Sequence, residues 1–310
     1  MTANTDNMRR RTAAFLASAM VSGATVWILG SIGRVRIGNE YTSQAFLIPV
    51  LCGYLIWHER GRIFATPESD LREASHFLAG AVVAGLGTWY FYAVRNAYLF
   101  SALLVLSGIL LVISSFAAFY GALAVRRAVF PFSMLLMAIP LPNSIVQGII
   151  SILQAQSAWL SAVLFSMIGV PVFKEGFFLT VPGVTIEVAR ECSGINSSIA
   201  MVLTMLLVAR ETLNSNWRRA ALVAATVPLS ILKNAIRITA LTMLALRVDP
   251  SFLTGRLHHQ GGIVFYLIAI ALMYPLWKLL KRGDRQDVPK NDLISKRILH
   301  LSTPELHTKA

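Results

Sequence analysis

The chain has 310 residues, of which 55% are hydrophobic and only 14% carry a formal charge, and its mean hydropathy is +0.62. These values argue against an ordinary soluble enzyme and indicate a membrane protein with several spans. The net charge of +13 does not indicate nucleic-acid binding, because the basic residues cluster between apolar runs and at both ends, as in cytoplasmic loops near anionic lipid. We therefore expect membrane lipid, and no nucleic acid, among the partners.

Eight runs with few or no charges predict transmembrane helices, because a backbone in lipid satisfies its polar groups within the helix. The runs are residues 13–33, 42–57, 75–94, 98–120, 128–141, 193–209, 219–240 and 260–280. The predicted fold class is thus an all-α integral membrane protein with about eight transmembrane helices. The first run follows Arg9, Arg10 and Arg11, and its length favours an uncleaved span over a signal peptide. The expected organisation is a cytoplasmic N-terminus (1–12), a membrane domain (13–280) and a basic cytoplasmic tail (281–310).

One long stretch, residues 128–173, contains no formal charge and is interrupted at Pro140-Leu141-Pro142-Asn143. After this break, uncharged polar residues recur every three or four positions, which places them on one helix face: Ser144, Gln147, Ser151, Gln154, Ser157 and Ser161. This stripe is typical of an amphipathic helix that lies at the membrane interface over residues 144–170. It also fits an ordinary span whose polar seam packs on its neighbours.

The distribution of basic residues favours the interfacial interpretation, because cytoplasmic loops are enriched in Lys and Arg. If residues 144–170 lie at the interface, the basic loops all fall on the side of Arg9 to Arg11. If they make an additional ninth span, Arg218, Arg219 and the basic tail move outside. We therefore expect eight spans with both termini in the cytoplasm.

Residues 177–188 predict a short β-hairpin, because Pro182-Gly183 separates two β-branched runs. The expected topology puts this segment on the outer face, where a strand edge could pair with an extended peptide. A plain connecting loop fits the pattern equally well.

A candidate nucleophile lies where a polar segment meets an apolar run: Cys192, flanked by Arg190 and Glu191. The other cysteine, Cys52, lies within a predicted span and is interpreted as packing, so no disulfide framework is expected. The expected topology brings two further groups to the same outer side. They are Arg237, about eighteen residues along a helix that runs outward, and His258, just before the last span.

These residue types make a coherent catalytic set. A thiol becomes a nucleophile when a base or positive charge favours its thiolate, and His258 can take that proton and return it to the leaving amine. Arg237 can stabilise the oxyanion, with Asn234 in support. Arg237 and Lys233 can instead extend to the lipid head groups, and His258 can be an ordinary interfacial histidine. No metal-ligand spacing or phosphate-binding loop occurs, so we expect no metal or cofactor.

At these residues the chain resembles the exosortase/archaeosortase family of membrane cysteine transpeptidases. The matching motifs are C192-S-G194, N234-A-I-R237 and H258-H-Q-G-G262. Residues 41–57 also resemble the family's second span, although Ser43-Gln44-Ala45 stands where the family often has Ser-His-Gly. The resemblance covers roughly residues 40–280.

The resemblance implies a function and a site. The function is cleavage of a C-terminal sorting signal, made of a short Pro-containing motif, a transmembrane helix and a basic cluster, from exported proteins. Cleavage through a Cys192 thioester precedes transfer to an acceptor whose identity the sequence does not give. The implied location is the bacterial cytoplasmic (inner) membrane, with the site at its extracytoplasmic face, usually beside exopolysaccharide production. The spacing to Gly262 selects His258 over His259 as general acid/base, and Asn234, Ser193, Gly194 and Gly262 are implied supporting residues.

Two other functions remain open from the sequence. One is a hydrolytic intramembrane cysteine protease, in which water accepts the acyl group. The other is a non-catalytic component of polysaccharide or lipid export, in which Lys233 and Arg237 line a path for an anionic substrate.

Overall fold

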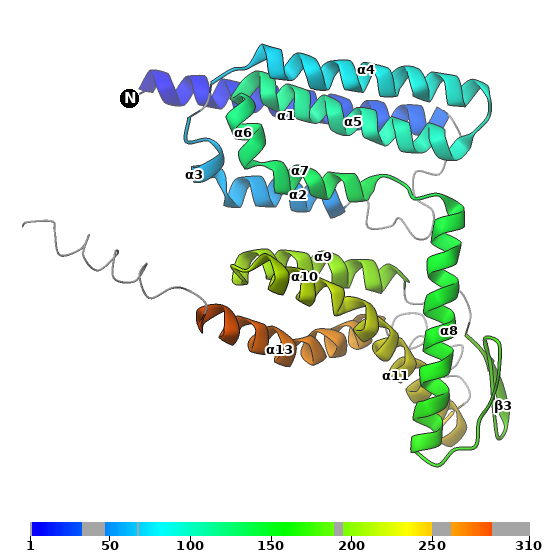
Figure 1. The fold of residues 1–310 in the computed structure, drawn as a ribbon. Helices are drawn as coiled ribbons and strands as arrows, with labels where there is room; N and C mark the ends of the chain where they lie inside the picture. The colour runs from blue at the N-terminus through cyan, green and yellow to red at the C-terminus, as the bar shows by residue number, and fades with distance from the viewer. Residues whose placement is uncertain (1, 33–46, 67, 189–194, 250–261, 287–310) are drawn as a thin grey trace, which may run out of the picture. The chain divides into compact units, whose positions relative to one another are not determined.

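The computed structural model describes residues 2–32, 47–66, 68–188, 195–249 and 262–286. The described chain is mostly helical and divides into two compact units, Met1–Gly148 and Ile149–Ala310 (Figure 1). The all-α membrane class predicted from the sequence is confirmed. The single membrane domain predicted over residues 13–280 covers parts of both units.

The first unit is built around a helical hairpin of α4 (Leu71–Ala93) and α5 (Ala97–Tyr120). Asp70 and Asn96 cap the two helices with their side chains, as N-cap residues commonly do. Serines of α5 then donate hydrogen bonds to carbonyls of α4, Ser107 to Ala81 at 3.0 Å and Ser114 to Ala74 at 2.8 Å. Such small polar contacts are typical of helices that pack in membranes.

The remaining helices of this unit complete it. They are α1 (Thr2–Ile32), α2 (Leu47–His58), α3 (Arg60–Ile63), α6 (Ala122–Arg127), α7 (Val129–Leu135) and a 3₁₀ turn (Leu136–Ala138). Phe15 of α1 makes edge-to-face contacts with Phe116 and Tyr120 of α5. At Gly121 the chain turns with φ of 88°, and a Cβ there would meet the Glu68 carbonyl oxygen at 1.8 Å, so this position requires glycine.

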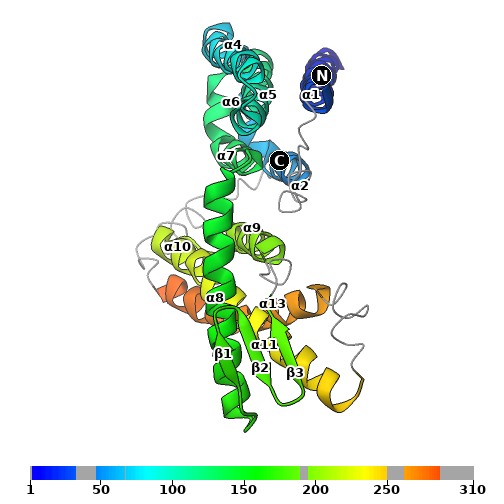
Figure 2. The same ribbon diagram turned by 90° about the vertical axis from the view of Figure 1, so that its right-hand side faces the viewer.

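The second unit combines helices with a small sheet (Figures 1 and 2). Its helices are α8 (Asn143–Met167, most of which lies in this unit), α9 (Ile195–Thr212), α10 (Asn216–Ala224), α11 (Thr226–Arg247) and α13 (Gly262–Gln286). Three antiparallel strands lie side by side in the order β1 (Phe173–Glu175), β2 (Phe178–Val181) and β3 (Val184–Glu187). Strands β2 and β3 occupy the segment predicted as a hairpin and turn at Pro182-Gly183, where Gly183 has φ of 93°. Strand β1 is an addition that the sequence did not predict.

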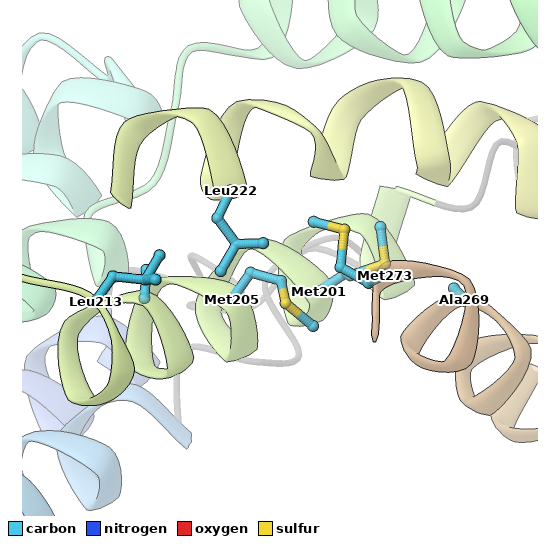
Figure 3. Close-up of a cluster of buried hydrophobic side chains, with 7 residues drawn as sticks. Met201, Met205, Leu213, Leu222, Ala269 and Met273 are labelled. Carbon is cyan, nitrogen blue, oxygen red and sulfur yellow. The ribbon is translucent and has the colours of Figure 1, made fainter. Parts of the chain in front are cut away.

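A methionine-rich core joins α9, α10 and α13 (Figure 3). The cluster consists of Met201, Met205, Ala209, Leu213, Leu222, Ala269 and Met273. Beside it, buried Asp284 accepts hydrogen bonds from the backbone N–H groups of Asn214 and Ser215 at 2.7 and 3.0 Å, and Arg218 pairs with it at 3.3 Å. This carboxylate therefore fixes the start of α10 against α13, which supports the helix that leads into α11.

Five described helices are long and apolar enough to cross a membrane: residues 8–31, 97–120, 143–167, 216–247 and 264–284. The segments predicted as spans at 75–94 and 193–209 coincide in their described residues with α4 and α9, which are helical but are not among these five. The apolar helices at 47–58 and 129–138 are shorter. Helix 143–167 covers most of the segment (144–170) that we expected at the membrane interface. Its length and composition also allow it to cross the membrane.

Candidate functional site

The polar stripe of α8 forms a seam that packs inside the second unit. Gln154, Ser157 and Ser161 are buried, whereas Ser144 and Ser151 are exposed. The Gln154 amide donates to the Val188 carbonyl at 2.7 Å, and the Ser161 hydroxyl donates to the Ala235 carbonyl at 3.4 Å. The interpretation of this stripe as a packed seam therefore holds for its second half, because the structure uses these groups to bind α11 and the strand end.

Helix α11 carries three polar side chains close together in sequence, of which Asn234 bonds to this seam. Asn234 is 1% exposed and donates from its amide to the Ser157 hydroxyl at 3.1 Å. Lys233 is 3% exposed and donates to the hydroxyl of Ser197, close to the start of α9. Arg237, one turn further, is partly buried. A buried cation inside an apolar helix is costly, and such a residue usually has a function.

These observations argue against one alternative for Lys233 and correct one expectation for Arg237. Lys233 does not extend to the head groups, because its ammonium group is buried against Ser197. Arg237 does not lie at the end of its helix, because α11 continues to Arg247, about 15 Å further at 1.5 Å per residue. The candidate cationic pair thus lies in the middle of the helix rather than at its tip.

The sheet covers the half of α11 that follows Arg237. One apolar cluster joins the sheet to α8 and α11. Its buried members are Leu179 and Val181 of β2, Val188, Ala158 and Phe165 of α8, and Ile238 of α11. Val184 and Ile186 of β3 pack against this cluster. Ile238 is the residue after Arg237. The inner face of β3 therefore packs on an apolar cluster that includes the residue next to the candidate oxyanion group.

The two flanks of the Cys192 segment are anchored to α8 and to α11, two helices that bond to each other through Asn234 and Ser157. On the N-terminal side, Val188 is held by Gln154 and by its own N–H bond to the Phe177 carbonyl at 2.9 Å. On the C-terminal side, Ser197 is held by Lys233. The structure thereby brings together the approaches to Cys192 and the motif that carries Asn234 and Arg237.

Other predicted site residues lie outside the described part of the chain. They are Cys192, Ser193, Gly194, His258 and His259. Gly262 is the first residue of α13. Their roles stay predictions.

Sequence reasoning missed the parts played by Gln154, Ser157 and Lys233. The spacing of the stripe showed that Gln154 and Ser157 lie on one face of their helix. Periodicity does not show which other element packs against that face. For Lys233 the available signal was its spacing of four from Arg237, which puts both cations on one side of α11. Two cations one turn apart in a site of low dielectric favour bound or developing negative charge, such as a thiolate or an oxyanion.

A comparison with known protein families decides the classification. The family model of the transmembrane exosortases matches residues 35–275. The chain belongs to the transmembrane exosortase family. The match spans all three motifs, at residues 192–194, 234–237 and 258–262, so the family resemblance seen in the sequence is confirmed. No curated protein and no solved structure matches this exosortase.

Proposed function

We propose that this exosortase is a protein-sorting transpeptidase of the bacterial cytoplasmic membrane. It cleaves a C-terminal signal from exported proteins through a thioester on Cys192 and transfers the acyl group to an acceptor. One observation supports this most: Gln154 of α8 and Lys233 of α11 hold the two flanks of the Cys192 segment, and Asn234, next to Lys233, bonds to Ser157 of α8.

The proposed reaction has two stages. His258 takes the Cys192 thiol proton, and the thiolate sulfur attacks the carbonyl carbon of the scissile peptide bond. Arg237 stabilises the negative charge on the carbonyl oxygen. The C–N bond then breaks, the departing amine takes the proton from His258, and a thioester remains. The acceptor nucleophile attacks this thioester, loses its proton to His258 and releases the Cys192 thiolate, which regains that proton.

Lys233 and Asn234 act as positioning residues in this proposal. The Asn234 bond to Ser157 sets the rotation of α11 against α8, and with it the direction of Arg237. The Lys233 bond to Ser197 ties the start of α9 to α11. Because a misplacement of about 1 Å costs roughly a hundredfold in rate, these contacts matter to the chemistry without touching the substrate.

The proposed membrane topology is argued from helix lengths and charges. Residues 129–138 give roughly 15 Å of helix, too short for a hydrocarbon core of about 30 Å, whereas α8 is long enough. We propose that α8, and not α7, makes the fifth crossing. The other seven spans are those expected from the sequence, and they contain α1, α2, α4, α5, α9, α10 with α11, and α13; α2 is the described part, Leu47–His58, of the expected span at residues 42–57. Both termini and the basic loops stay in the cytoplasm, and the sheet lies on the outer face.

The chemical form of the product tests transfer against hydrolysis. A tagged exported protein with a Pro-containing C-terminal motif, a transmembrane helix and a basic tip is expressed with the exosortase, and its new C-terminus is analysed by mass spectrometry. Transfer predicts an added acceptor mass on the terminal carboxyl group. A bare carboxylate on all of the product would establish the hydrolytic protease instead.

The two adjacent histidines give a separate prediction. His258→Ala is expected to abolish processing, because it removes the group that moves the proton, whereas His259→Ala leaves processing within a few-fold of wild type. The initial rate of processing in membranes measures both. If His259→Ala alone abolishes processing, the assignment passes to His259.

A further inference from the structure

The outer edge of β3 carries backbone groups that point away from the rest of the sheet. The Val188 N–H donates to the Phe177 carbonyl, so these two residues form a hydrogen-bonded pair. In an antiparallel ladder such pairs alternate with non-hydrogen-bonded pairs. Given the register Phe178 to Glu187 and Thr180 to Thr185, the N–H and C=O groups of Thr185 and Glu187 face outward.

The side chains at the same two positions are exposed, and they lie on the face of the sheet away from the apolar cluster. The Thr185 hydroxyl lies 3.2 Å from that of Thr180, as expected for a non-hydrogen-bonded pair. Within the described residues, no strand pairs with this edge of β3. An unpaired strand edge is a template for another extended chain.

Two features connect this edge to the candidate site. Strand β3 ends at Glu187, only five positions before Cys192 in the sequence, and its last paired neighbour, Val188, is anchored by Gln154. The inner face of β3 packs by Ile186 on the cluster that contains Ile238, the residue after Arg237. The opposite edge, β1, follows the end of α8 and leads to no candidate catalytic residue.

We infer that the free edge of β3, at Thr185 and Glu187, binds the extended segment of the substrate that precedes the scissile bond, by strand addition. This inference rests on the proposed function of the site. The added strand makes hydrogen bonds to the two outward N–H groups and the two outward carbonyls. A substrate thereby runs alongside β3 toward Cys192, and recognition uses its backbone together with every second side chain.

A proline in the substrate is compatible with this mode of binding. Proline has no N–H and is tolerated in a strand only where that group would face away from the partner. In an added strand such positions recur at every second residue. The β3 edge therefore accepts prolines two residues apart and disfavours adjacent ones.

Proline substitution on the enzyme tests the inference with a matched control. The Thr185 N–H faces outward, so Thr185→Pro removes an edge donor without removing a bond between β2 and β3. By the same register, the Lys174 N–H of β1 faces outward on the opposite edge, and Lys174→Pro is the control. We expect Thr185→Pro to raise KM for the tagged substrate at least tenfold, with alkylation of Cys192 by a small maleimide unchanged, and Lys174→Pro to alter neither. Equal KM values for the two variants would overturn the inference.

A crosslinking experiment gives a second readout that does not depend on the proline variants folding. Thr185→Cys is introduced together with Cys192→Ala and Cys52→Ala, and single cysteines are scanned through the substrate upstream of the cleavage point. We expect disulfides at every second substrate position, and none when Lys174→Cys replaces Thr185→Cys. No crosslink, or the same crosslinks from both edges, would contradict strand addition at β3. Cleavage retained by Cys192→Ala alone would instead contradict the proposed function, so the two failures are distinguishable.

Discussion

Replacing Cys192 with alanine is expected to abolish cleavage of the sorting signal, with a fall in rate of at least about 10⁴-fold. The reason is chemical: no thioester can form, and the histidine and arginine have no nucleophile to serve. The measurement is the processing of a tagged substrate in membranes, followed by immunoblot with time.

Cys52→Ala is the matched control for this substitution. Cys52 is the chain's other cysteine and is 4% exposed inside α2, so its replacement removes a buried thiol without touching the candidate site. We expect processing at the wild-type rate. Undiminished processing by Cys192→Ala, or equal losses from both variants, would reject Cys192 as the nucleophile.

Arg237→Gln is expected to lower kcat by about 10²–10³-fold, the usual loss when one oxyanion-stabilising group is removed. Arg237→Lys should recover part of this loss, because it keeps the charge but not the forked geometry of the guanidinium group. The rates are measured with saturating substrate, after thermal unfolding in detergent has shown that each variant is folded.

Arg247→Gln is the control on the same helix. Arg247 is exposed at the end of α11, so its loss is expected to leave kcat unchanged. Neutral substitutions of Arg237 and Lys233 can also be compared with Cys192→Ala in cells. If only the former abolish the function of the protein, the chain is an export component that uses its cations to bind an anion. If Arg237→Gln and Arg247→Gln behave alike, Arg237 has no special part in the reaction.

Much of the local structure was predictable from the sequence. Charge-free runs predicted α1, α5 and α13 closely, because a helix in lipid must be long and apolar. The Pro-Gly turn predicted the strands around residues 178–187. Helix ends were less accurate: α1 begins at Thr2 and includes the residues predicted as a separate N-terminus, and α13 extends to Gln286 into the predicted tail.

The tertiary partners were not predictable in the same way. The stripe on α8 has the spacing of an interfacial helix and of a packed seam alike, and only the contacts to Val188, Asn234 and Ala235 distinguish them. Strand β1 was missed because its three exposed residues lack any alternation. For Lys233 the sequence left extension to the head groups open, because a lysine near a span end normally reaches water and no local pattern shows that Ser197 lies within its reach.

The candidate site was predicted in its residue types and not in its architecture. Motif spacing in the sequence selected Asn234 and Arg237, and the structure shows that Ser157 and Ser161 of α8 bond to Asn234 and to the neighbouring Ala235 carbonyl. The depth of Arg237 along α11 was misjudged, because the sequence suggested a helix that ends near residue 240, whereas it continues to Arg247.

The most direct test of the central claim is to identify the covalent intermediate. The wild-type enzyme is incubated with substrate, quenched early in acid, digested and analysed by mass spectrometry for an acyl group on Cys192. We predict a substrate fragment attached to the Cys192 sulfur and released by hydroxylamine, as a thioester is. Processing of the substrate with no hydroxylamine-sensitive adduct on Cys192 in the wild-type enzyme, or an adduct on another residue, would contradict the proposed mechanism.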